Sequence, residues 1–110
     1  MGSIAMDKCG DIAIGYSVSS GILNPAIRYA GRTTDMTLYP LGTLGTETAV
    51  VTGVPAAGSQ TQSNRWGDYS SMRVDPVDDS TFWYTTEYIP ADGNFNWRTY
   101  IVRFKFTSCP

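Results

Sequence analysis

The chain has 110 residues, a length that fits a single domain with a modest core. Its hydrophobic content of 42% and charged content of 16% are those of a folded globular chain and exclude a disordered one. The net charge of −2, without any run of Lys or Arg, offers no basic surface, so we expect no nucleic-acid partner.

The sequence contains no histidine. This excludes His general bases, the Ser-His-Asp and Cys-His catalytic arrangements, and His metal ligands. Any catalysis would have to use carboxylates, arginine, tyrosine or an oxygen-ligated metal. No apolar run approaches the roughly 20 residues that a membrane-spanning helix needs, and we expect no membrane contact.

Residues near the two ends of the chain bear on whether the protein is secreted. The opening residues MGSIAMDK lack the apolar core of a signal peptide, and MGS resembles the start of a recombinant protein, so we expect a native export signal to be absent from this chain. Lys8 and Lys105 are the only lysines, which favours a secreted, extracellular protein. Cys9 and Cys109 lie near opposite ends; their spacing leaves open a disulfide within the chain, a disulfide between chains, and two free thiols.

Several segments alternate with period two, and none shows the sustained 3.6-residue period of a helix. Segment 11–18 has Ile, Tyr and Val at even positions and Ala, Gly and Ser between them. The less regular middle of the chain contains one short strand, 48–52. Segments 80–88 and 96–106 carry most of their aromatic residues at even positions.

Turn-forming residues separate these strands. They are DKCGD, SSGILNP, DPVDD and PADGN, which begin at residues 7, 19, 75 and 90. Short strands joined by such turns, in a chain with 11 Gly and 6 Pro, predict an all-β fold of antiparallel strands.

A weak internal repeat also runs through the chain. Residues 7–17 align without a gap on residues 75–85, which places Asp7 on Asp75 and Tyr16 on Tyr84. A shift of two residues continues the match, with Arg28 on Arg98. We therefore expect one module spanning 1–110, built from approximate units 4–63 and 64–110.

The two units are expected to differ at their starts. In the second unit the stretch RWGDYSSMRVD, residues 65–75, reads as a full strand before the aspartate-rich turn. Only six residues precede Asp7, so the first unit is expected to start truncated. Incomplete units leave open sheet edges, which favour pairing with another copy of the chain.

The stretch WGDYSSMRVDPVDDSTFWYTTEY, residues 66–88, resembles the strand–turn–strand of secreted bacterial β-propellers of the sialidase-like, BNR-repeat type. MDKCGDIAIGYSVSS with PAIRYAGR is similar to part of another blade, and YIVRFKFTSCP to a closing strand with its cysteine. The resemblance implies two propeller-like blades. Because a closed propeller needs at least about four blades, it also implies homo-oligomerisation, with a trimer of six blades favoured.

The sequence departs from catalytic sialidases. The Ser-x-Asp-x-Gly-x-Thr-Trp box of that family keeps only Asp78 and Trp83 in register here. A catalytic sialidase also needs an arginine triad, a Tyr–Glu pair and a separate acid spread over several blades. About two blades cannot supply that set, so the resemblance does not imply sialidase activity.

Four features are candidate sites, each with a structural alternative. Asp68, repeated around the axis of a ring, would hold a divalent cation such as calcium, or would bond a neighbouring backbone. Glu87 would pair with Arg98 on the next strand, or act as a general acid if buried against Trp83. DPVDD would supply oxygen ligands or only form a turn. The tryptophans would stack on sugars or fill gaps between blades; they are Trp66, Trp83 and Trp97.

Two functions follow from these candidates. The first is a non-catalytic ligand-binding or scaffold module that recognises carbohydrate, with a site made of Arg65, Trp66, Tyr69, Trp83 and Arg98. The alternative is a hydrolase of phosphoesters or glycosides that uses Asp68, Glu87 and a divalent metal bound by Asp68 in a channel between subunits.

Overall fold

The structure is a computed structural model that describes all residues except 24, 35–47, 53–65 and 92–95. The described residues form strands and turns without a helix, so the all-β prediction is confirmed. None of them forms a helix that could cross a membrane. The strands are β1 (Ser3–Met6), β2 (Ile12–Val18), β3 (Ala26–Arg32), β4 (Thr48–Thr52), β5 (Ser71–Val74), β6 (Thr81–Tyr88) and β7 (Arg98–Lys105).

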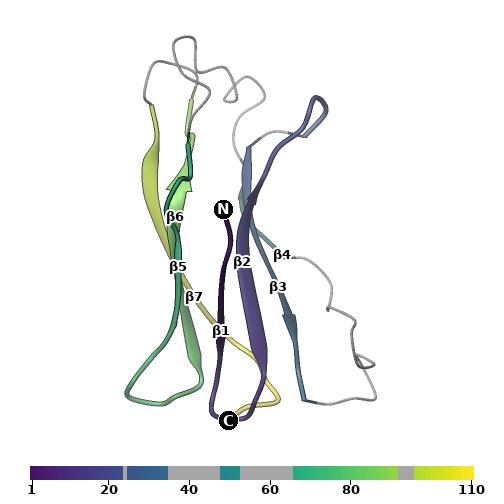
Figure 1. Cartoon of the computed structure of the whole chain (residues 1–110), viewed down its shortest axis with the longest axis vertical. Coiled ribbons are helices and arrows are strands. Elements are labelled where there is room, and N and C mark those ends of the chain that lie inside the picture. Colours follow the sequence, from purple (N-terminus) through teal and green to yellow (C-terminus); the bar gives the residue numbers. More distant parts are fainter. Residues whose placement is uncertain (24, 35–47, 53–65, 92–95) are drawn as a thin grey trace.

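The strands make two antiparallel sheets, each a meander in chain order. Sheet A has the order β1-β2-β3-β4 and sheet B the order β5-β6-β7. The strands run along the long axis of the molecule, and the β1–β2 hairpin, the β5–β6 hairpin and the C-terminus lie at the same end (Figure 1). The sheets are also linked where β1 approaches β5, since the Met72 amide donates a hydrogen bond to Ser3 Oγ at 2.8 Å.

The meanders β1-β2-β3 and β5-β6-β7 follow the alignment of the two units. Their first strands, β1 and β5, are both four residues long. The expectation of a full strand over residues 65–75 was therefore wrong, as was that of a truncated first unit. The strand begins only at Ser71, and Gly67 before it adopts a left-handed φ of 68°, which is not a strand conformation. The expected boundary at residues 63 and 64 lies outside the described residues.

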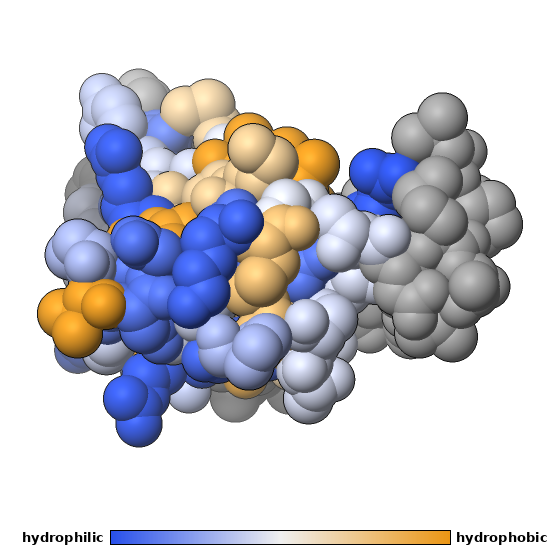
Figure 2. Space-filling model, turned by 90° about the horizontal axis from the view of Figure 1, so that it is seen from below, coloured by the Kyte–Doolittle hydropathy of each residue, from blue (hydrophilic) through white to orange (hydrophobic). Residues whose placement is uncertain are grey.

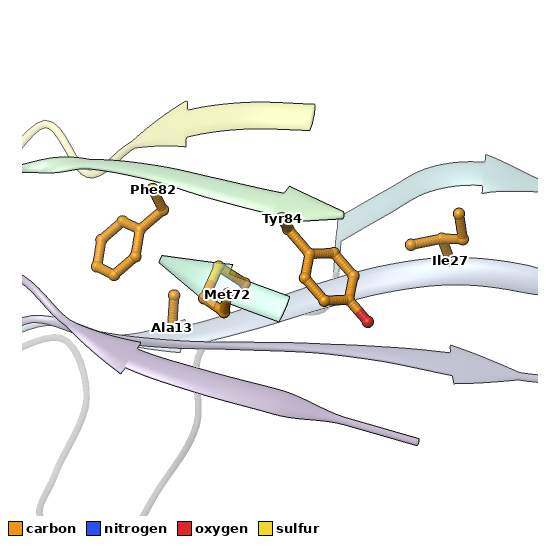
Figure 3. Packing of buried hydrophobic residues seen from close by; sticks show 5 residues of the cluster. All are labelled: Ala13, Ile27, Met72, Phe82 and Tyr84. Atoms are coloured by element: carbon orange, nitrogen blue, oxygen red, sulfur yellow. The ribbon is translucent and has the colours of Figure 1, made fainter. Parts of the chain in front are cut away.

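The core lies between the two sheets. It consists of Ala13 and Ile27 from sheet A and Met72, Phe82 and Tyr84 from sheet B (Figure 3). On β6 the buried residues lie at the even positions, as the alternation in the sequence indicated. We call the face of each sheet that packs on the other sheet its inner face, and the opposite face its outer face.

On β2 the small residues form the inner face. Ala13 and Gly15 are buried, whereas Ile12 and Ile14 point to the outer face. The reason is the size of the partner side chains on sheet B. A Cβ atom added to Gly15 would lie 2.5 Å from Cζ of Tyr84, so the ring occupies the space that a side chain would need.

The same arrangement recurs on β3. A Cβ atom on Gly31 would clash with the ring of Phe106. Tyr29, which pairs with Gly15 across β2 and β3, stacks on Phe104 with 3.9 Å between the ring centroids. The sheets are therefore held together by aromatic rings of sheet B, and of Phe106 directly after β7, which lie on glycines and on one ring of sheet A.

Replacing Gly15 by alanine should destabilise the fold by about 1–3 kcal/mol, because the new methyl group must displace the Tyr84 ring. The matched control is Gly21→Ala, where no atom lies within 4 Å of the added Cβ and the free energy of unfolding should change by less than about 0.5 kcal/mol. Urea unfolding of both variants measures the difference. Equal stability of Gly15→Ala and the parent chain would contradict this packing.

Candidate functional site

Glu87 holds the segment just before β5 in place. Its Oε2 accepts a hydrogen bond from the amide of Gly67 at 2.7 Å, and the N-terminal amino group donates to the carbonyl of Gly67 at 3.4 Å. On either side of this glycine, Trp66 and Asp68 are half-buried. Tyr69 is 82% exposed. The structure thus brings Glu87 to the segment that carries three other candidate residues.

Glu87 does not face Arg98. In the register of β6 and β7, Glu87 lies opposite Thr99, whereas Arg98 lies opposite Tyr88. The two side chains therefore point to opposite faces of sheet B, and the expected cross-strand ion pair was wrong. The ion pair would require a register in which Glu87 lies opposite Arg98. The observed register differs from it by one residue, and such a shift moves a side chain to the other face of the sheet.

The DPVDD segment is a hairpin turn whose carboxylates bond its own backbone. Asp75 Oδ1 accepts from the amide of Val77, and Asp78 Oδ1 accepts from the amides of Ser80 and Thr81, each at 2.9 Å. The Thr81 hydroxyl donates to Asp78 Oδ2 at 2.6 Å. This hydroxyl, together with the two amides, holds the pKa of the Asp78 carboxyl well below its ordinary value. The structural interpretation of DPVDD is confirmed.

Trp83 lies on the outer face of sheet B, where it is 37% exposed. Its indole Nε1 donates to Asp75 Oδ2 at 3.0 Å, so the hairpin fixes the orientation of the ring. Arg73 on β5 and Arg103 on β7 are its direct cross-strand neighbours. The guanidinium carbon of Arg103 lies 6.0 Å from the indole centroid, at the limit of a cation–π contact. We call Arg73, Trp83, Arg103 and Asp75 the indole platform.

Trp97 lies away from this platform. Trp97 is exposed and precedes β7. It lies six positions before Arg103, the neighbour of Trp83, which is about 20 Å along a strand at ~3.3 Å per residue. Arg98, also exposed, donates to the carbonyl of Trp97 at 3.4 Å. Arg65 lies outside the described residues.

Asp68 remains a prediction as a metal ligand. Among the residues that the structure describes, one group of three side chains has the proximity that a metal ion requires, namely Asp7, Cys9 and Cys109. Asp68 does not belong to it. The two cysteines of that group form a disulfide within the chain, which decides the alternative that spacing left open, and their sulfurs are not available as thiolate ligands.

Asp11 is a buried carboxylate that sequence reasoning missed. Its Oδ1 accepts from the amide and the hydroxyl of Thr34, at 2.7 and 3.2 Å, and its Oδ2 accepts from the hydroxyl of Ser108 at 2.7 Å. Asp11 thereby joins the first hairpin to the segment after β3 and to the C-terminus. The repeat alignment had matched it with Asp79, which is exposed. Its partners are distant in sequence, so no local pattern indicates this role.

Comparisons with protein-family models, with curated proteins and with solved structures find no match to this chain.

Replacing Asp78 by asparagine should reduce the dependence of stability on acid pH. The pKa of Asp78 in the folded state lies below the ordinary value of 3.8, so its ionised form contributes stability above about pH 4. That contribution is lost as the pH falls through the depressed pKa. We expect Asp78→Asn to be less stable than the parent chain at pH 7 and to lose less stability between about pH 4 and pH 2.

Thermal unfolding at a series of pH values measures this effect. Asp79→Asn is the matched control, because Asp79 is exposed and asparagine also tolerates its positive φ of 55°. An Asp78→Asn profile parallel to that of the parent chain would show that the turn does not depend on the charged form.

Proposed function

We propose that this chain is a non-catalytic ligand-binding module of the sialidase-like β-propeller type, that it is secreted, and that it binds carbohydrate through the indole platform. The observation that carries the proposal is the exposed Trp83 ring, oriented by Asp75 and placed between Arg73 and Arg103. Two successive antiparallel meanders, one of four strands and one of three, support the propeller-type assignment.

The platform has the chemistry of a sugar site. An aromatic ring whose orientation is fixed offers a flat apolar surface to the C–H groups of a sugar without a large loss of side-chain entropy. Guanidinium groups donate several hydrogen bonds in a plane and match carboxylate and sulfate groups. Arg73 and Arg103 thus favour a glycan that carries acidic groups.

The carboxylates near this surface support a binding role over a catalytic one. Asp75 and Asp78 are engaged by turn amides and neighbouring side chains. Each of them therefore has a structural task. The Cys9–Cys109 disulfide agrees with an oxidising, extracellular compartment.

Replacing Trp83 by alanine should weaken binding of an acidic oligosaccharide at least tenfold, about 1.4 kcal/mol, because the stacking surface is removed. Arg73→Ala should weaken binding of acidic glycans more than that of neutral ones. Trp97→Ala is the control, since this indole lies away from the platform. The measurement is a glycan array followed by titration calorimetry. Unchanged affinity of Trp83→Ala for every bound glycan would refute the site.

A hydrolase is the second candidate, and the hydrogen bond from the Gly67 amide to Glu87 favours it, because this bond brings Glu87 to the segment of Asp68. In this alternative Asp68 holds a divalent cation such as calcium and Glu87 transfers a proton during hydrolysis of a phosphoester or glycoside.

Asp68→Asn should then abolish turnover of a nitrophenyl phosphate or glycoside, and so should a chelator, while circular dichroism shows that the variant is still folded. The control is Asp79→Asn, which alters an exposed carboxylate of the hairpin. Turnover that survives both Asp68→Asn and chelation would exclude this metal-dependent mechanism.

A further inference from the structure

The end of the molecule that carries the β1–β2 hairpin and the C-terminus brings three side chains together that can bind a metal. One carboxylate oxygen of Asp7 and the sulfurs of Cys9 and Cys109 all lie within 4.8 Å of one another. Asp7 is 5% and Cys109 0% exposed, whereas Cys9 is half-buried. Figure 2 looks onto this end, where hydrophilic side chains cover much of the coloured surface. The group is therefore mostly enclosed by protein, and Cys9 is its member nearest to water.

The Asp7 carboxylate has one oxygen that the disulfide-bonded chain leaves unsatisfied. Its Oδ1 accepts from the amides of Cys9 and Asp11, at 2.9 and 3.0 Å, and these bonds fix the orientation of the carboxylate. Its Oδ2 is buried and accepts no hydrogen bond from the residues that the structure describes. A buried carboxylate oxygen in this state is unfavourable, and a donor or a cation beside it removes the cost. The sulfurs of a disulfide carry no proton, so they cannot act as that donor.

Hydrogen bonds as well as the disulfide hold the two cysteines close together. Asp7 Oδ1 binds the Cys9 amide, and Asp11 Oδ2 accepts from the hydroxyl of Ser108, the residue before Cys109, at 2.7 Å. The two aspartates belong to one turn, since the Asp7 amide donates to the Asp11 carbonyl at 2.9 Å. None of these bonds uses a sulfur atom. The Cα atoms of the cysteines are 5.8 Å apart, so in a reduced chain both thiols stay within reach of one metal ion.

We propose that Asp7, Cys9 and Cys109 bind a zinc-type divalent cation when the two cysteines are reduced, and that this metal site and the disulfide exclude each other. Two thiolates and a carboxylate are ligands that zinc accepts in tetrahedral coordination, with a water molecule as the fourth. Thiolates favour zinc over calcium and magnesium, which prefer oxygen ligands. The cation also gives the buried carboxylate of Asp7 a positive partner.

The metal and the disulfide act at different stages in the life of the chain. A newly made chain carries both cysteines as thiols, and binding of zinc displaces one proton from each thiol to solvent without transfer of electrons. Formation of the disulfide instead removes two electrons from the two sulfurs, and a low-molecular-weight disulfide that accepts them is reduced to two thiols. The metal therefore links the first hairpin to the C-terminus before the disulfide takes over this task.

The metal site is independent of the proposed glycan binding. None of its three ligands belongs to the indole platform, so a result on glycan binding neither supports nor contradicts it. In an oxidising compartment the disulfide replaces the metal, and both states thus fit a chain that is secreted after its synthesis.

Titration of the reduced chain with cobalt(II) tests the site, because cobalt bound to thiolates absorbs light through charge transfer from sulfur. A phosphine first reduces the disulfide; it takes up the oxygen of one water molecule and leaves two thiols. We expect one cobalt ion per reduced chain, which zinc displaces, and none per disulfide-bonded chain. Zinc should also raise the thermal unfolding midpoint of the reduced chain and leave that of the disulfide-bonded chain unchanged.

Asp7→Asn should weaken the binding of cobalt to the reduced chain at least about tenfold, which is the smallest effect that loss of an outer-shell partner usually has. Asp79→Asn is the matched control, since it alters an exposed carboxylate of the β5–β6 hairpin, and its cobalt affinity should equal that of the parent chain. A reduced parent chain that binds no cobalt would overturn the proposal. Equal affinities of Asp7→Asn and the parent chain would overturn it too, because two thiols of an unfolded chain would give that result.

X-ray absorption at the zinc edge provides a test that needs no variant. The zinc-loaded reduced parent chain should have two sulfur ligands at about 2.3 Å and oxygen ligands at about 2.0–2.2 Å. Four sulfur ligands per zinc would mean that two chains share the ion, and this result would contradict a site completed by Asp7.

Discussion

The contact between aromatic rings of sheet B and glycines of sheet A is the constraint on which the rest of the structure depends. Tyr84 and Phe106 occupy the space above Gly15 and Gly31, so the two sheets approach more closely there than larger side chains would allow. The approach brings the hairpins together, and the amide of Lys8 donates to the carbonyl of Asp79 at 2.8 Å. The two sheets therefore pack as one unit, and the inner face of each is covered by the other.

Much of the fold could be predicted from the sequence, because period-two alternation and turn residues are local signals. They indicated the strands of residues 11–18, 80–88 and 96–106, and the short strand Thr48–Thr52. Alternation does not say which face of a strand is buried. On β2 the bulky residues point outward, since sheet B already supplies the rings that fill the core. Which face of β2 is buried can be predicted only when the side chains of the facing sheet are known.

The candidate site was predicted less completely. Trp83 was found because tryptophan is rare and stands out, whereas its neighbours Arg73 and Arg103 depend on strand register, which the sequence determines poorly. The supposed pair of Glu87 and Arg98 failed for the same reason. Asp11 was missed because its partners, Thr34 and Ser108, lie 23 and 97 residues away along the chain.

The link between the first hairpin and the C-terminus has a consequence for folding. Cys9 and Cys109 are 100 residues apart, and Ser108 supplies a partner of the buried Asp11. Sheet A therefore cannot reach its final packing until the last strand of the chain has been made. Such nonlocal contacts slow folding, because a long loop must close before they form. During synthesis on the ribosome, the inner face of sheet A, with Gly15 and Gly31, therefore stays uncovered until Tyr84 and Phe106 have been made.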